Sequence, residues 1–318
     1  MRQIILGRTG ISVSELCLGA LPMGPGQKNL PVEEGGRIIA ACFKGGCNFI
    51  DTAQMYRTYP HIRNAMDKTG ITPVISTKSA ASTYEDMDAA VQEALTALGL
   101  DVIDIFLLHA ARATEGIFED RAGALQCLLD YKAKGVVKAV GISTHAVNAV
   151  EAAAAHDDVD VIFPVINQLG LGILNGNTQT MEAAIRKAFA ADKGVFFMKA
   201  LAGGRLVRDY ENAMSYARNL SDGRAAIAVG MVSEWEAEMN SRYFNGEDIS
   251  AFFTDLPKKE KRFTVLKFLC VACGNCENVC HSDAIAQGED GKYDINDEKC
   301  LLCGYCVDGC PSFCIRLI

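Results

Sequence analysis

The sequence predicts an α/β protein in which a (β/α)8 barrel is followed by a small cysteine-rich α+β domain. Two observations in the 318-residue chain support this prediction. Up to about residue 250, short apolar runs alternate with amphipathic stretches at intervals of roughly 30 residues, the length of a strand-plus-helix unit. Nine of the 13 cysteines then fall between Cys270 and Cys314. We therefore expect a barrel over residues 1–253, a linker over 254–264 and a second domain over 265–318.

The expected barrel strands are short and apolar, and each one begins a strand–helix unit. In chain order they are Leu16–Leu18, Asn48–Ile50, Val74–Thr77, Ile103–Leu108, Ala139–Ile142, Val161–Ile166, Val195–Met198 and Ala226–Val229. Eight such units in about 250 residues fit a TIM barrel in number and size. An open doubly wound sheet is the alternative, but no GxGxxG motif follows the first strand.

Helical patterns fill the intervals between these strands. In Thr83–Leu98 the apolar residues recur on one face, as an amphipathic helix requires. Similar patterns occupy Gly123–Lys134, Ala146–His156 and Thr178–Asp192. The opening segment Gln3–Val13 contains two glycines and predicts a hairpin that covers the floor of the barrel.

Composition and charge exclude several classes of protein. With 49% hydrophobic and 22% charged residues, the chain is not disordered as a whole. A net charge of −8 argues against general nucleic-acid binding, which needs a basic face. No apolar run approaches the roughly 18 residues of a membrane span. The N-terminus lacks the apolar core of a signal peptide, so we expect a cytoplasmic protein.

The cysteines of the second domain form two runs with one spacing. The first run is Cys270-x2-Cys273-x2-Cys276-x3-Cys280, and the second is Cys300-x2-Cys303-x2-Cys306-x3-Cys310. This spacing is typical of two 4Fe–4S clusters, in which the fourth cysteine of each run binds the other cluster. The first cysteine set is therefore Cys270, Cys273, Cys276 and Cys310. The second cysteine set is Cys300, Cys303, Cys306 and Cys280.

Zinc is the rival ligand for these cysteines, but zinc sites favour two separated CxxC pairs over two runs of four. The offset from Cys270 to Cys300 indicates an internal duplication, with Gly288–Gly291 as the turn of a connecting hairpin. Cys314 lies outside both runs, and we expect a buried thiol there. The clusters could relay electrons or merely stabilise a small core. Two clusters favour the relay, because stabilisation needs only one.

Polar residues follow six of the expected strands, at the end of the barrel where TIM-barrel chemistry takes place. These residues are Asp51, Lys78, His109, Ser143, Gln168 and Lys199, and Tyr56 follows Asp51 in the same loop. A lysine ammonium beside a tyrosine lowers the pKa of the phenol, and an aspartate keeps the lysine charged. A histidine can polarise a carbonyl group. Asp51, Tyr56, Lys78 and His109 therefore predict a general acid aimed at an oxygen that gains negative charge.

At these residues the sequence resembles the aldo-keto reductase family. The matching segments are LGRTGISVSELCLG (Leu6–Gly19), NFIDTAQMY (Asn48–Tyr56), ISTKS (Ile75–Ser79), IDIFLLH (Ile103–His109) and GVVKAVGIST (Gly135–Thr144). The cysteine-rich domain resembles the bacterial dicluster ferredoxin, with His281 where that family usually has proline. The whole chain is thus similar to a ferredoxin-tailed branch of the aldo-keto reductases.

The resemblance implies that Tyr56 is the catalytic proton donor, with Lys78, Asp51 and His109 in support. It also implies a nicotinamide site, with Ser143 and Gln168 at the carboxamide. It places Gly203, Gly204 and Arg205 against the pyrophosphate, and Gly230 and Ser233, followed by Asn240, at the adenosine end. Lys199, which follows the seventh strand, is a further expected cofactor-binding residue.

Three residues depart from the family pattern at the nicotinamide site. Met198 stands where many members stack an aromatic ring, and Thr144 stands where an asparagine often binds the carboxamide. Glu236 stands where a basic residue usually meets the adenosine phosphate. Because a carboxylate repels a 2′-phosphate, the resemblance favours NAD over NADP.

We therefore expect an iron–sulfur oxidoreductase that reduces or oxidises a small carbonyl or related unsaturated compound, with the clusters as an electron relay. A hydride carries two electrons and a cluster moves one, so a flavin could serve as an adaptor. A ferredoxin-like protein would be the external electron donor or acceptor. Two alternatives stay open: an electron-transfer or redox-sensing subunit whose barrel is a docking scaffold, and a nicotinamide-dependent reductase whose clusters are structural.

Overall fold

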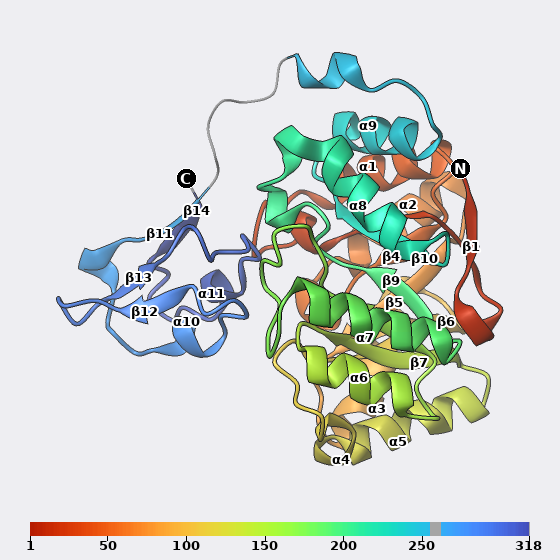
Figure 1. The fold of residues 1–318 in the computed structure, drawn as a ribbon, viewed down its shortest axis with the longest axis horizontal. Coiled ribbons are helices and arrows are strands. Elements are labelled where there is room, and N and C mark those ends of the chain that lie inside the picture. Colours follow the sequence, from red (N-terminus) through yellow and green to blue (C-terminus); the bar gives the residue numbers. More distant parts are fainter. Residues whose placement is uncertain (255–261, 318) are drawn as a thin grey trace.

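The computed structural model describes residues 1–254 and 262–317. It contains a closed barrel and, against one end of it, a small unit that we call the cysteine module (residues 262–317) (Figure 1). The linker predicted over 254–264 lies mostly outside the described residues.

Eight parallel strands form the barrel, and their order around it is their order along the chain. They are β3 (Leu16–Gly19), β4 (Phe49–Asp51), β5 (Val74–Ser79), β6 (Ile103–His109), β7 (Val137–Thr144), β8 (Val161–Pro164), β9 (Gly194–Phe197) and β10 (Ala225–Gly230). All eight predicted strands are confirmed, and the open-sheet alternative is wrong because β10 pairs with β3. The strand residues are buried because side chains fill the barrel on one face and helices cover the other.

Helices surround the barrel (Figure 1). They are α1 (Val32–Lys44), α2 (Tyr59–Thr69), α3 (Tyr84–Leu98), α4 (Ile117–Asp120), α5 (Ala122–Ala133), α6 (Val147–Ala155), α7 (Thr178–Ala190), α8 (Tyr210–Ser221) and α9 (Glu234–Phe244). The four helical patterns read from the sequence correspond to α3, α5, α6 and α7. The α3 boundaries have local causes, because the Thr83 hydroxyl caps the first turn and Gly99 ends the helix with φ 65°.

Short 3-10 helices connect several of these elements. They are η1 (Gly7–Thr9), η2 (Leu21–Met23), η3 (Gln54–Tyr56), η4 (Ala202–Gly204), η5 (Val207–Asp209), η6 (Ser250–Phe253) and η7 (Lys267–Leu269). None of the described helices combines the length and hydrophobicity that a membrane span requires.

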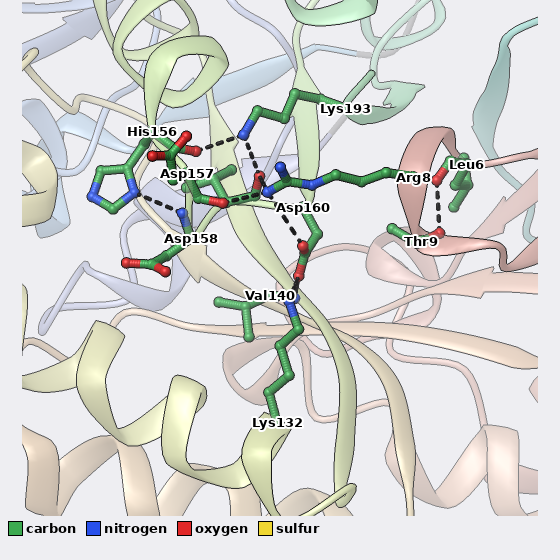
Figure 2. Close-up of polar contacts among 11 residues, drawn as sticks. Leu6, Arg8, Thr9, Lys132, Val140, His156, Asp157, Asp158, Asp160 and Lys193 are labelled. Atoms are coloured by element: carbon green, nitrogen blue, oxygen red, sulfur yellow. Dashed lines mark hydrogen bonds and ion pairs between the residues drawn. The ribbon is translucent and has the colours of Figure 1, made fainter. Parts of the chain in front are cut away.

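The opening segment forms the predicted hairpin, with β1 (Gln3–Ile5) antiparallel to β2 (Ser12–Ser14). Figure 2 shows how it is fixed to the barrel floor, the end at which the strands begin. The Arg8 guanidinium donates to the Val159 carbonyl at 3.0 Å and lies 3.6 Å from the Asp160 carboxylate. Asp160 also accepts from the Val140 amide at 3.0 Å and pairs with the Lys132 ammonium. The floor is therefore held by polar contacts that centre on the buried Asp160, at the opposite end of the barrel from the strand ends that carry the predicted site.

The cysteine module contains two antiparallel strand pairs and two short helices. The pairs are β11 (Phe263–Val265) with β14 (Ile315–Leu317) and β12 (Ile285–Gln287) with β13 (Tyr293–Ile295). The helices are α10 (Asn275–Asn278) and α11 (Tyr305–Asp308). The predicted turn closes β12 and β13, since the Gly291 amide donates to the Gly288 carbonyl at 3.0 Å.

The two halves of the module repeat the same backbone. Residues in the left-handed region recur with the offset of the cysteine runs: Ala272 and Leu302 at φ 56° and 52°, and Gly274 and Gly304 at φ 78° and 83°. Glycine suits the second pair, because a side chain in that conformation is strained. The internal duplication predicted from the cysteine spacing is thus confirmed in the backbone.

Candidate active site

Four predicted catalytic residues converge at the strand ends opposite the floor. Asp51 ends β4, Lys78 lies near the end of β5, His109 ends β6, and Tyr56 ends η3 in the loop after β4. Because β4, β5 and β6 are neighbours in the barrel, their ends bring these side chains to one place.

Lys78 and Asp51 form a buried ion pair. The Lys78 ammonium donates to both Asp51 carboxylate oxygens at 2.7 Å and to the Thr52 carbonyl at 2.8 Å. The Ser76 hydroxyl also donates to Asp51. Burial raises the pKa of Asp51 and lowers the pKa of Lys78, while the attraction between the two groups opposes both shifts. All three ammonium protons have acceptors, so none is left for the Tyr56 hydroxyl.

The expected lowering of the Tyr56 pKa is wrong for this arrangement. The pKa of Tyr56 is raised well above its usual value, first by burial and then by the neighbouring Tyr305 and Asp51. Lys78 faces Asp51 and Thr52, and its nitrogen lies 5.0 Å from the centre of the Tyr56 ring. Tyr56 is therefore a protonated phenol at neutral pH, which is the form that can donate a proton.

His109 presents a neutral ring to the same place. Burial, together with the nearby Lys78 and His281, lowers the pKa of His109 well below its usual value. Its Nδ1 is buried without a hydrogen-bond partner among the described residues. Its Nε2 points to Tyr305, at 3.3 Å from that hydroxyl. A neutral imidazole in this position can donate a hydrogen bond to an oxygen.

Tyr305 is a site residue that the sequence analysis missed. It begins α11 in the cysteine module, and only 8% of its surface is exposed. Its hydroxyl oxygen lies 3.1 Å from that of Tyr56, and both rings belong to one apolar cluster that Cys303 contacts. The sequence gives little indication of this role: a tyrosine stands between the predicted ligands Cys303 and Cys306.

The second cysteine set lies over the mouth of the barrel, where barrel side chains bind its main chain. Gln27 donates to the Cys303 carbonyl and Arg205 to the Cys300 carbonyl, each at 3.2 Å. Arg112 donates to the Cys280 carbonyl and pairs with Asp283 at 2.7 Å. Each of the three is therefore a specific contact to a predicted cluster ligand.

Two glycines allow the module to approach the barrel closely. A Cβ atom at Gly203 would lie 2.1 Å from the Leu301 carbonyl oxygen. A Cβ at Gly304 would lie 2.2 Å from the Gly26 carbonyl oxygen. Because both obstacles are main-chain atoms, neither position accepts a side chain without moving the module.

A cavity of about 750 Å³ lies between the barrel and the module. Tyr56 and His109 line it from the barrel, and Leu301, Cys303 and Tyr305 line it from the module. Eight of the nine residues predicted to bind a nicotinamide cofactor also line it: Ser143, Lys199, Gly203, Gly204, Arg205, Gly230, Ser233 and Asn240. Gln168 is the exception, since its amide donates to Asp209 at 2.9 Å. Of these eight, Gly203 and Arg205 contact the module.

The adenosine end of the predicted cofactor site is fixed by local hydrogen bonds. The Glu236 carboxylate accepts from the Val232 amide at 2.6 Å, and the Ser233 hydroxyl caps α9. Asn240 accepts from the Tyr210 hydroxyl at 2.6 Å and donates to the Glu236 carbonyl at 2.7 Å. A negative charge is therefore held at the place where the family usually has a basic residue.

The cysteine sets fit the ligands of iron–sulfur clusters. All of the cysteines are free thiols. Backbone amides donate to several of the sulfurs, from Leu302 to Cys300 at 3.4 Å and from Ala284 to Cys280 at 3.3 Å. Such amide bonds stabilise cluster thiolates.

Three further residues lie beside the predicted ligands. Cys314 is buried as expected, and its sulfur lies 3.4 Å from that of Cys310. The His281 ring packs 4.6 Å from the ring centre of Tyr305. Burial lowers the pKa of Lys199, whereas the charges of Cys303, Cys300 and Cys280 raise it, so this ammonium faces the second cysteine set.

Comparison with protein families divides the chain as the sequence analysis did. The aldo/keto reductase family matches residues 15–246, and a 4Fe-4S dicluster domain matches residues 269–314.

Curated relatives match the two parts separately. An aldo-keto reductase of Mycobacterium marinum is 27% identical over 158 residues, which are 47% of this chain and 53% of that protein. One from Mycolicibacterium paratuberculosis is 26% identical over 242 residues, 73% of this chain and 80% of that protein. One component of the Na(+)-translocating ferredoxin:NAD(+) oxidoreductase complex of Acetobacterium woodii is 42% identical over 52 residues, 16% of each chain. The chain thus spans about half the length of the first of these reductases.

Solved structures match the fold of the barrel. A structure from Pseudomonas aeruginosa described as an aldo-keto reductase has a TM-score of 0.65 and 24% identity, covering 77% of this chain and 94% of that one. The Bombyx mori aldo-keto reductase in complex with NADP has a TM-score of 0.58 and 18% identity, covering 79% and 92%.

Proposed function

The chain belongs to the aldo/keto reductase family, and from that premise we propose that it is an iron–sulfur oxidoreductase. It reduces or oxidises a carbonyl or related unsaturated group of a small molecule, with electrons relayed through two clusters. One observation supports this more than any other: Cys303, a predicted ligand, lines the same cavity as Tyr56 and His109.

The proton chemistry falls to the barrel residues. Reduction of a carbonyl to an alcohol takes up two electrons and two protons: one proton forms the O–H bond, and the other, drawn from solvent, forms the C–H bond. Tyr56 gives the proton of the O–H bond: its pKa is raised by burial, so the phenol is a weak acid, but the alkoxide that forms on reduction is a stronger base and takes the proton. His109 donates a hydrogen bond from Nε2 to the same oxygen, and the positive charge of Lys78 stabilises the phenolate that remains.

The electron chemistry falls to the cysteine module. Bound to the two cysteine sets, the clusters would supply one electron each, which together match the two that a carbonyl takes up. Gln27, Arg112 and Arg205 hold the second set at the cavity. Lys199 adds a positive charge beside it, which favours a more negative, reduced state.

A nicotinamide is the second candidate for the electron source, because eight of its nine predicted contacts line the cavity. The fixed Glu236 carboxylate favours NAD over NADP. We rank this candidate lower, since Arg205 and Gly203 already contact Cys300 and Leu301 of the module. A flavin adaptor would share the same cavity, and no described residue selects it.

The first cysteine set is the proposed entry point for electrons from a ferredoxin-like protein. Cys273 is exposed there, and so are the apolar side chains of Phe268, Val271 and Phe313. Apolar residues around an exposed ligand suit contact with another redox protein. Because such clusters need a reducing compartment, we also propose a cytoplasmic location.

The test uses anaerobically purified protein with both clusters reduced by dithionite. It is mixed with a panel of small aldehydes and ketones, while the cluster absorbance and the alcohol product are followed. We expect reoxidation of the clusters with alcohol formation in the wild type, and its loss in Tyr56→Phe with the iron content unchanged. Tyr216→Phe is the matched control, since that hydroxyl bonds Glu182 on the outer helices.

The two alternatives predict other results. A barrel that is only a docking scaffold would make Tyr56→Phe behave as the wild type in every assay. Structural clusters would stay reduced in the presence of substrate, while NADH alone would support turnover.

A further inference from the structure

We propose that Tyr305 occupies the position of a substrate's oxygen, so that this residue of the cysteine module determines when, and which, substrates reach Tyr56. The inference rests on the proposed function, because it concerns the same catalytic site. Its evidence is the geometry around one hydroxyl group.

The Tyr305 hydroxyl stands where a substrate oxygen would receive its proton. A general acid must lie within hydrogen-bond distance of the oxygen that it protonates. The Tyr305 oxygen lies 3.1 Å from the Tyr56 oxygen and 3.3 Å from His109 Nε2. The Tyr305 hydroxyl therefore occupies a position from which a carbonyl oxygen could accept hydrogen bonds from both Tyr56 and His109.

Because the site is buried, the Tyr305 hydroxyl can leave its position only if another oxygen replaces it. Tyr305 is buried, and its ring packs against His281 at 4.6 Å. If its hydroxyl left alone, the polar groups of Tyr56 and His109 would lose their partner inside the protein, which is unfavourable. A carbonyl oxygen arriving in its place restores both hydrogen bonds. Substrate binding and departure of the hydroxyl are therefore coupled.

The moving part is the side chain, because the backbone beside it is fixed. Gln27 holds the Cys303 carbonyl at 3.2 Å, and Gly304 packs on the Gly26 carbonyl. The ring also lines the cavity of about 750 Å³, which offers space for rotation about the side-chain bonds. The module thus stays docked while the phenol swings out of the oxygen position.

The displaced ring then shares the cavity with the substrate. A rotated phenol takes volume beside the carbonyl carbon, so compact substrates fit better than bulky ones. Tyr305 is in this sense a specificity-determining residue supplied by the second domain, and its removal should widen the range of substrates.

The test measures binding of benzamide, a carbonyl compound that this chemistry does not reduce, to the anaerobic holoprotein by calorimetry. In Tyr305→Phe the ring stays but the competing hydroxyl is gone, so we expect the dissociation constant to fall about fivefold, the equivalent of one hydrogen bond. We expect the wild type to bind 2-naphthamide much more weakly than benzamide, and Tyr305→Ala to bind both. Tyr293→Phe, elsewhere in the module, is the matched control, and iron content verifies folding.

The outcomes separate this inference from the proposed function. Unchanged or weaker benzamide binding in Tyr305→Phe, or no binding in any variant, would overturn the inference even if the wild type turns over aldehydes. A loss of turnover in Tyr305→Phe would also overturn it, because the hydroxyl would then be required. Tighter benzamide binding that disappears in the Tyr56→Phe/Tyr305→Phe double variant supports it, even where no aldehyde is reduced.

Discussion

The two halves of the cysteine module have the same cysteine spacing and the same backbone, but their surroundings differ. Val271 and Leu301 occupy equivalent positions, and 64% of the first is exposed against 2% of the second. Asn275 is the counterpart of Tyr305, whose hydroxyl reaches Tyr56, the proposed proton donor. The spacing of ligands thus sets the shape of a cluster loop, whereas single residues between the ligands decide whether the loop faces solvent or an active site.

The largest expected difference between the two halves follows from removing one predicted ligand from each cysteine set. We expect Cys303→Ala and Cys273→Ala each to lose about half of the iron, because each set binds one cluster. Cys303→Ala should lower dithionite-driven turnover at least about a hundredfold, since Cys303 lines the cavity and is a predicted ligand of the cluster nearest to Tyr56. Cys273→Ala should retain more of that turnover and lose electron uptake from a ferredoxin-like donor. Equal losses of turnover in the two variants would contradict the assigned roles.

Alanine substitutions at Gly274 and Gly304, which are equivalent positions, should separate two costs in stability: backbone strain within the loop and collision with the barrel. Gly274→Ala and Gly304→Ala both place a side chain at positive φ, which costs about 1–2 kcal/mol. Gly304→Ala also collides with the Gly26 carbonyl, so we expect a loss of about 2–4 kcal/mol in its free energy of unfolding. Anaerobic denaturant unfolding measures both. A loss at Gly274 as large as that at Gly304 would mean that docking contributes little.

The smallest expected effect is a pH dependence of the free energy of unfolding, which arises from histidines buried where the barrel meets the module. The pKa of His109 and of His145 is well below the usual value in the folded protein, because both rings are buried at the interface. The unfolded chain therefore takes up protons near pH 6.5 that the folded protein does not. Stability should fall as the pH falls below about 6.5, by about 1 kcal/mol per pH unit for each ring.

Substitution of these histidines checks the assignment. Below about pH 6.5, His109→Gln should reduce the slope of the free energy of unfolding against pH by the contribution of one histidine ring. The double variant with His145→Gln should reduce it by the contribution of two. An unchanged slope in His109→Gln would show that its ring is protonated in the folded state.

The parts of the molecule that sequence predicts are those that local spacing specifies. Strands such as Ile103–Leu108 are apolar over their whole length, and Asp51 and Tyr56 share one loop, so their convergence follows from the barrel. The cluster ligands follow from spacing alone.

The parts that sequence does not predict depend on contacts between distant segments. Tyr305 meets Tyr56 across 249 positions, and nothing in either segment encodes that approach. Arg205, expected at a pyrophosphate, also donates to the Cys300 carbonyl, a contact that the sequence analysis did not foresee. The pKa of Tyr56 is raised rather than lowered, first by burial and then by Tyr305, which comes from the distant module, and by Asp51. Lys78 meanwhile donates a hydrogen bond to the Thr52 carbonyl, a main-chain atom that residue patterns do not reveal.

The close approach at Gly203 and Gly304 limits how the two regions can evolve. A clash between two side chains can be relieved by a compensating substitution in the partner, but here each glycine faces a main-chain carbonyl. No substitution removes a carbonyl, so a mutation at either glycine has no second-site rescue at the contact itself. The barrel and the cysteine module therefore constrain each other's sequences at single positions. A module transplanted from another protein would first need a glycine at the position of Gly304, opposite a barrel with a glycine at the position of Gly203.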